Sequence, residues 1–138
     1  MSSLDTLIKL HRWQLDEQRR RVAECETLAE KLRAEMQRLD SEEEFEQRVA
    51  TDSQEGSYAY GPYARALIER RSKLAQSVQE TEQQIVSARA ALADAYAEVK
   101  RYEIAAANRL LAKHRGIERI RQQELDEVAL AGFRRKEK

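Results

Sequence analysis

Residues that interrupt regular structure are scarce in this chain, whose 138 residues include four glycines and one proline. No segment alternates apolar and polar residues between turn signals, so β-strands are not expected. Cys25 is the only cysteine, which excludes an internal disulfide. We also find no apolar run long enough for a signal peptide or a membrane span, and therefore expect a cytoplasmic protein.

A net charge of one sign is lacking too, because 25 Lys and Arg balance 25 Asp and Glu. The protein as a whole is therefore not attracted to nucleic acid or to anionic membranes. The charges are unevenly placed, however. Residues 40–55 are acidic with Arg48 as their only cation, whereas residues 109–138 are rich in Arg and Lys. We expect one acidic end and one partly basic end.

Apolar residues recur at alternating steps of three and four in the first forty residues, which is the spacing of a coiled-coil seam. The stripe consists of Leu4, Ile8, His11, Leu15, Gln18, Val22, Cys25, Ala29, Leu32, Met36 and Leu39. Cys25 is interpreted as a small seam residue. Serine before Leu4 and Asp5 in the first turn favour a helix that starts near Ser3 and continues to about Thr51. Phe45 and Val49 extend an apolar face toward its end.

A single cluster of helix breakers, Gly56, Gly61 and Pro62, predicts a turn over about residues 52–61. A second helix should begin near Pro62 and reach about residue 135. Its stripe has the same spacing: Ala64, Leu67, Arg71, Leu74, Val78, Thr81, Ile85, Ala88, Leu92, Ala95, Val99, Tyr102 and Ala106.

Two long helices joined by a short turn are expected to pack antiparallel. The predicted fold is all-α: one coiled-coil domain over residues 1–138, a helical hairpin in which Leu39 faces Val78 and Val22 faces Ala95. Residues 116–138 then lack a partner in the first helix. They either overhang as a lone helix, fold back, or wait for another protein.

Signs of catalysis are absent from the sequence. A two-helix rod has no interior in which to enclose a substrate, and no phosphate-binding loop or nucleophile motif occurs. His11 and His114 fall near one level of the hairpin, but no third ligand converges on them. We expect no enzyme activity, no cofactor and no metal.

Several apolar residues lie outside the seam near the two chain ends: Leu7, Leu10, Trp13, Ile104, Leu111, Leu125, Leu130 and Phe133. Either they pack the ends together, with the C-terminal segment folded onto Trp13, or they form a docking surface flanked by Arg and Lys. At the turn, Phe45, Tyr58, Tyr60 and Tyr63 either fill the turn or form an aromatic–acidic contact patch.

The opening segment, LDTLIKLHRWQLDEQRR over residues 4–20, resembles the N-terminus of the FliJ family of flagellar type III export proteins. Length, charge-rich composition and one central turn agree over the whole chain. Members of that family are similar to the central stalk of rotary ATPases and to virulence-secretion proteins of the YscO type. The resemblance implies a peripheral location at the flagellar base.

The resemblance further implies that the paired terminal ends insert into the hexameric export ATPase ring and promote its assembly. It implies contact with the cytoplasmic domain of the export gate membrane protein, through the turn-proximal half, and escort of export chaperones. The ring-facing residues would be Leu4, Leu7, Ile8, Trp13, Leu110, Ile117, Ile120, Phe133 and Arg134. The gate-facing residues would be Phe45, Tyr58, Tyr60 and Tyr63.

Two other interpretations stay open. An autonomous coiled-coil scaffold, with no ATPase partner, predicts a tight homodimer that buries Trp13 and Phe133 between chains. A nucleic-acid arm would need salt-dependent RNA binding through Arg119, Arg121, Arg134 and Arg135. The acids among these arginines argue against it, so no nucleic-acid partner is expected.

Overall fold

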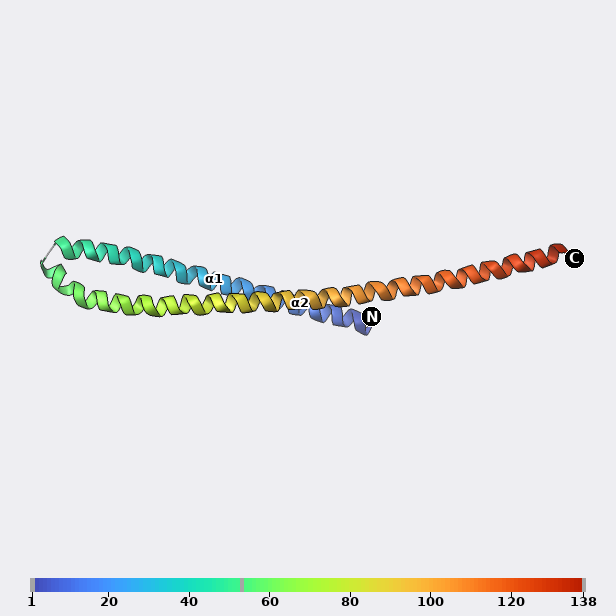
Figure 1. Ribbon diagram of the computed structural model, residues 1–138, viewed down its shortest axis with the longest axis horizontal. Coiled ribbons are helices and arrows are strands. Elements are labelled where there is room, and N and C mark those ends of the chain that lie inside the picture. Colours follow the sequence, from blue (N-terminus) through green and yellow to red (C-terminus); the bar gives the residue numbers. More distant parts are fainter. Residues whose placement is uncertain (1, 53, 138) are drawn as a thin grey trace. The chain divides into compact units, whose positions relative to one another are not determined.

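The computed structural model describes residues 2–52 and 54–137. They form two helices, α1 from Ser3 to Asp52 and α2 from Gln54 to Glu137 (Figure 1). No strand occurs in the described part of the chain, and the two helices pack against each other. The predicted all-α helical hairpin is thereby confirmed.

The start of α1 is fixed by reciprocal hydrogen bonds. The backbone N–H of Asp5 donates to the Ser2 hydroxyl at 3.2 Å, and the backbone N–H of Ser2 donates to the Asp5 carboxylate at 3.3 Å. This capping box satisfies backbone donors that have no partner within the helix. The hydrogen bonds from Ser2 lower the pKa of Asp5. The predicted start near Ser3 is confirmed.

The turn is shorter than predicted. α1 ends at Asp52 and α2 begins at Gln54, so residues 54–61 are helical and Pro62 lies inside α2. The predicted start of the second helix near Pro62 was wrong by eight residues. A proline inside a helix removes one backbone hydrogen bond and favours a bend. Figure 1 shows such a bend in the first turns of α2, drawn in green.

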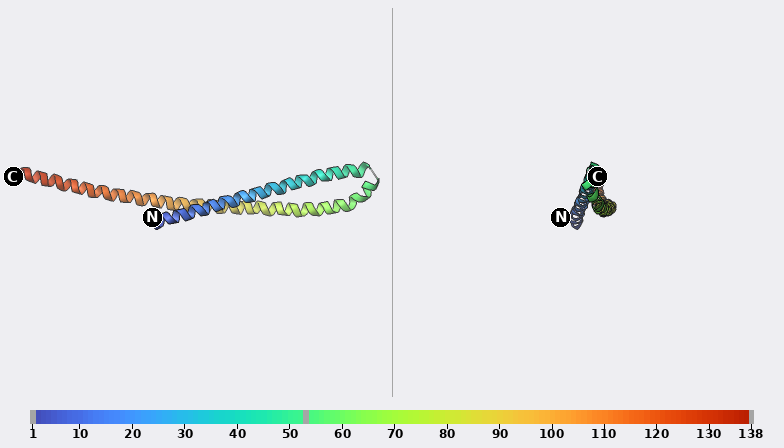
Figure 2. Two further views of the ribbon diagram at one scale, coloured as in Figure 1. Left: turned by 180° about the vertical axis from the view of Figure 1, so that it is seen from behind. Right: turned by 90° about the vertical axis from the view of Figure 1, so that its left-hand side faces the viewer.

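The chain divides into two compact units, which we call the terminal unit (residues 1–13 and 96–138) and the central unit (residues 14–95). Within the central unit α1 and α2 lie side by side and run in opposite directions (Figures 1 and 2). Each unit is described by itself below.

The predicted seam is confirmed in both helices. Every position of the two stripes is buried or half-buried, including the polar seam residues Gln18, Arg71 and Thr81. The Thr81 hydroxyl donates to the Ser77 carbonyl at 2.8 Å, which satisfies it within its own helix. Two small seam residues, Ala29 of α1 and Ala88 of α2, are almost completely buried. Small side chains at such positions allow the two helices to approach closely.

The apolar face expected at Phe45 and Val49 does not belong to the seam. Both side chains are exposed, and the half-buried positions beyond Leu39 are Glu43, Glu46 and Ala50. The spacing of 3.5 residues continues from Leu39 through these three residues, whatever their polarity. Phe45 and Val49 therefore lie outside the contact with α2.

Cross-helix ion pairs fix the register of the central unit. Arg33 contacts Glu82 at 3.1 Å, and Arg89 contacts Glu26 at 2.8 Å. Both pairs agree to within two residues with the predicted facing positions.

The acidic stretch near the turn is balanced more than the sequence indicated. Arg71 of α2 reaches across to Asp40 and also to Glu43, the latter at 2.8 Å. Arg48 pairs with Glu44 at 3.8 Å. Arg48 is the only cation within residues 40–55, and the antiparallel partner helix supplies a second one from a seam position.

Candidate partner-binding surfaces

The paired part of the terminal unit combines burial, stacking and an ion pair. Ile8 and Val99 are buried. The rings of His11 and Tyr102 stack with their centroids 4.6 Å apart. The Arg12 guanidinium donates to the Glu103 carboxylate at 3.1 Å, and Lys100 reaches the same carboxylate at 3.3 Å. Residues 2–13 are thereby attached to the stretch of α2 around residue 100.

Replacing Arg12 with glutamine is expected to raise the pKa of Glu103. The hydrogen bonds from Arg12, and then from Lys100, hold that pKa below its ordinary value. Because the pKa of the folded state is lowered, the stabilisation is present above the ordinary value and is lost as the pH falls through the lowered one. Carboxyl chemical shifts of Glu103 measured against pH test this. An unchanged midpoint in the Arg12→Gln variant would contradict it.

Beyond Ala106, α2 continues without a neighbour in the described part of the chain. Between residues 107 and 136 every residue is exposed except Gly116, which is half-buried. We call this stretch the free segment. At about 1.5 Å per residue it is roughly 45 Å long. Of the three outcomes considered for the C-terminal part, the structure has a helix that neither folds back nor breaks at Gly116.

The free segment carries large apolar side chains on a charged helix. Those exposed are Leu110, Leu111, Ile117, Ile120, Leu125, Val128, Leu130 and Phe133. None of its charged residues forms an ion pair within the described part of the chain. Among the residues that the structure describes, its side chains form one hydrogen bond, from Gln122 to Asp126 at 3.1 Å. In the paired region, by contrast, ion pairs are frequent. The free segment thus exposes both apolar area and unneutralised cations such as Arg119, Arg121 and Arg134.

The N-terminal residues proposed to face a ring are separated by the structure into two groups. Leu7 and Trp13 are exposed, with Trp13 at 61%, and so is the neighbouring Leu10, which was not in that set. Ile8 is 8% exposed and Leu4 is half-buried, so these two support the pairing with α2 instead of lining a free surface.

The alternative in which the C-terminal segment folds onto Trp13 was wrong. Trp13 and Phe133 are each 61% exposed. His11 and His114 are also not at one level, since His11 stacks on Tyr102, twelve residues earlier in α2. Within residues 2–52 and 54–137, no group of three His, Cys, Asp or Glu is placed to hold a metal ion.

The aromatic residues near the turn differ in exposure. Tyr58 is 86% exposed and Phe45 is also exposed, whereas Tyr60 and Tyr63 are half-buried with ring centroids 6.3 Å apart. Burial of Tyr63, together with the negative charges of Glu42 and Glu46, raises its pKa. Tyr60 and Tyr63 therefore help to fill the turn end, and Phe45 and Tyr58 are the accessible members of the set.

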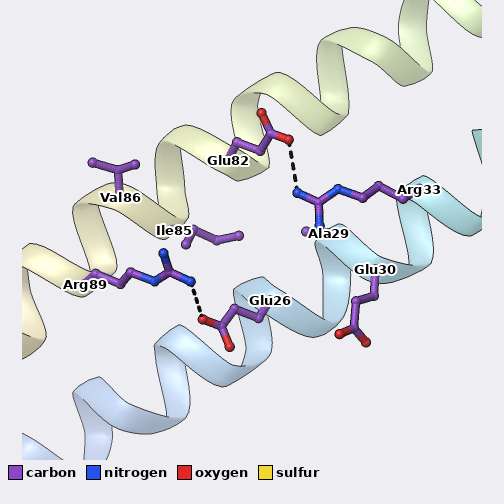
Figure 3. Close-up of a pocket in the computed structure, with 8 residues that line it drawn as sticks. All are labelled: Glu26, Ala29, Glu30, Arg33, Glu82, Ile85, Val86 and Arg89. Carbon is purple, nitrogen blue, oxygen red and sulfur yellow. Dashed lines mark hydrogen bonds and ion pairs between the residues drawn. The ribbon is translucent and has the colours of Figure 1, made fainter.

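A groove on the central unit was not expected from the sequence (Figure 3). Its volume is about 460 Å³, and it is lined by Glu26, Ala29, Glu30, Arg33, Glu82, Ile85, Val86 and Arg89. Ala29 and Ile85 form the floor, and the two cross-helix ion pairs stand at its sides. One sequence pattern could have indicated the ion pairs beside this groove. A Glu is followed seven residues later by an Arg next to the stripe of each helix, as Glu26 and Arg33 in α1 and as Glu82 and Arg89 in α2.

A family model described as flagellar FliJ protein matches residues 1–138. The chain belongs to the FliJ family. No curated protein and no solved structure matches it. Membership in the FliJ family makes this a flagellar export-related protein, and the family is a non-catalytic component of that export. None of the helices in the described part of the FliJ-family chain is long and apolar enough to cross a membrane.

Proposed function

We propose that this protein is a stalk-like component of the flagellar export apparatus. Its terminal unit inserts into the ring of the hexameric export ATPase and promotes assembly of that ring. The observation that carries the proposal is the free segment, a helix over residues 107–136 with exposed apolar side chains and no neighbour in the described part of the chain.

The apolar content of the free segment supports a protein partner. Isolated helices are marginally stable in water, and most helices gain their stability from packing an apolar face. Here Leu110, Ile117 and Val128 are exposed. A groove or lumen lined with apolar side chains would cover them, in the way that helices are bound in grooves. The exposed Leu7 and Leu10 of the same unit enlarge that surface.

The unpaired cations indicate what surrounds the apolar contact. Residues 109–121 contain Arg109, Lys113, Arg115, Arg119 and Arg121 against the single acid Glu118. A ring opening that presents carboxylates and backbone carbonyls would match this charge. Attraction between such surfaces increases the association rate and weakens with added salt.

A second contact is proposed at the turn end of the central unit. Phe45 and Tyr58 are exposed beside the acidic residues of α1. They would meet the cytoplasmic domain of the export gate protein, with Tyr60 and Tyr63 supporting the turn. In this proposal the protein lies in the cytoplasm at the flagellar base, reaches the membrane only through partners, and also escorts export chaperones.

The double substitution Leu7→Ala with Leu110→Ala tests the ring contact. Both side chains are exposed, so their removal should leave the helical circular dichroism signal nearly unchanged. Ring assembly and the ATPase activity that depends on it should fall, by about 30-fold if each of the two truncations removes ~1 kcal/mol of binding. Negative-stain microscopy and ATPase assays with the cell's export ATPase provide the measurement.

A matched control removes two exposed apolar side chains from the central unit, Leu28→Ala with Ile68→Ala. This variant should stimulate the ring as the unmodified protein does. Normal stimulation by the Leu7/Leu110 variant would contradict the insertion proposal. Light scattering addresses the scaffold alternative, since that alternative requires a tight homodimer that shields Trp13 from fluorescence quenchers.

A further inference from the structure

The two ion pairs beside the groove are related by an approximate local two-fold symmetry. In α1, Glu26 precedes Arg33 by seven residues, and in α2, Glu82 precedes Arg89 by seven. Because the helices are antiparallel, Glu26 meets Arg89 at 2.8 Å and Arg33 meets Glu82 at 3.1 Å (Figure 3). Each helix thus contributes one acid and one base at the same spacing.

That spacing equals the repeat of the seam. A coiled-coil seam looks alike after every seven residues, so α2 shifted by one heptad along α1 would again place apolar residues against apolar residues. Apolar packing at the seam therefore favours the observed register only weakly over the two registers in which α2 is shifted by one heptad in either direction. Another interaction has to favour the observed register.

A competing register also has a turn available. The two ion pairs centre on residues 57–58. A shift by one heptad moves that centre by half a heptad, about three or four residues, toward Gly61 and Pro62. Glycine and proline are strong turn residues. The chain therefore contains a turn signal that suits the wrong register, and the structure does not use it, since Gly61 and Pro62 lie inside α2.

We propose that Glu26, Arg33, Glu82 and Arg89 select the register of the hairpin by excluding both neighbouring ones. Shifting α2 by seven residues in one direction brings Glu82 to the place of Arg89, opposite Glu26. Shifting it in the other direction brings Arg89 to the place of Glu82, opposite Arg33. The second shift is the one that the Gly61–Pro62 turn would favour. Each shift replaces attraction by like-charge repulsion.

The exposure of these four side chains is consistent with a role in choosing the register and less so with a large contribution to the free energy of unfolding. All four side chains are between 45% and 63% exposed, and ion pairs at such sites add little to the free energy of unfolding. A register is chosen by the difference between arrangements, however, and like charges placed together raise the free energy of the wrong ones. This inference concerns the hairpin itself and does not depend on the proposed export role.

Reversing the charges on α1 alone provides the test. In the variant Glu26→Arg with Arg33→Glu, the observed register becomes repulsive and each shifted register gains an attractive pair. Nitroxide labels on cysteines introduced at the exposed positions Glu24 and Ser72, in a Cys25→Ala background, report the register by pulsed EPR. A one-heptad shift moves the labels by about 10 Å along the helices, at about 1.5 Å per residue.

Adding Glu82→Arg and Arg89→Glu restores complementarity and should return the label distance to that of the unmodified hairpin. The matched control exchanges charges within one helix, Glu17→Arg with Arg20→Glu, a pair that does not cross to α2. It should keep the original distance. An α1 reversal that keeps the original distance, or a fourfold variant that fails to recover it, would overturn the proposal.

Discussion

Replacing Ala88 with leucine should lower the free energy of unfolding of the hairpin by ~1–3 kcal/mol, because the added atoms overfill the seam. Ala88 is 0% exposed and Ala29 of the facing helix is 1% exposed. Small residues at this level let the two backbones approach closely. A leucine would force the helices apart and weaken neighbouring contacts. Chemical denaturation followed by circular dichroism at 222 nm measures the change.

The control for this substitution is Ala90→Leu on the same helix. Ala90 is exposed, so the same added volume should change stability by no more than ~0.5 kcal/mol. Equal effects at the two positions would mean that the seam tolerates bulk at Ala88, and the close approach described for the central unit would then be incorrect.

Ending the chain at Ala107 should abolish stimulation of the export ATPase, with a loss of at least tenfold, while leaving the thermal midpoint of the hairpin nearly unchanged. The free segment forms no ion pair and buries no apolar side chain within the described part of the chain. Its removal therefore costs the hairpin little. The contacts of Ile8, His11 and Arg12 with the region around residue 100 remain intact.

Two measurements on the truncated protein separate folding from binding. Thermal unfolding establishes that the hairpin persists, and sedimentation with the export ATPase establishes whether the complex forms. A truncated protein that still assembles the ring would show that residues 108–138 are dispensable for the proposed contact. A large drop in thermal midpoint would instead reveal that the free segment packs on the hairpin.

Much of the fold follows from the spacing of apolar residues. Steps of three and four identify the seam from Leu4 to Leu39 and from Ala64 to Ala106, and the antiparallel arrangement follows from one turn. The same rule predicts that seam positions remain in the contact even when their residues are polar. Arg71 and Gln18 satisfy it, and so do Glu43 and Glu46.

Two features could not be obtained from the sequence by these rules. Helix breakers between residues 56 and 62 indicated a long turn, but the helix tolerates Pro62 by bending, and α2 already begins at Gln54. The pairing of Arg71 with Asp40 and Glu43 joins distant positions, and local charge counts miss such pairs. The exposed surfaces near the chain ends were foreseen as one of two alternatives, which only the placement of Trp13 and Phe133 could separate.

The change in seam chemistry along the central unit sets where the hairpin opens first. From Leu15 to Leu39, the contact of α1 with α2 consists mainly of buried apolar residues. Nearer the turn, the contact between the two helices depends on Glu43, Glu46, Arg71 and Tyr63. Charged and hydroxyl-bearing groups lose less by returning to water than apolar ones do. Amide hydrogens near the turn should therefore exchange before those beside Ala29 and Ala88, and unzipping on heating should proceed from the turn inward.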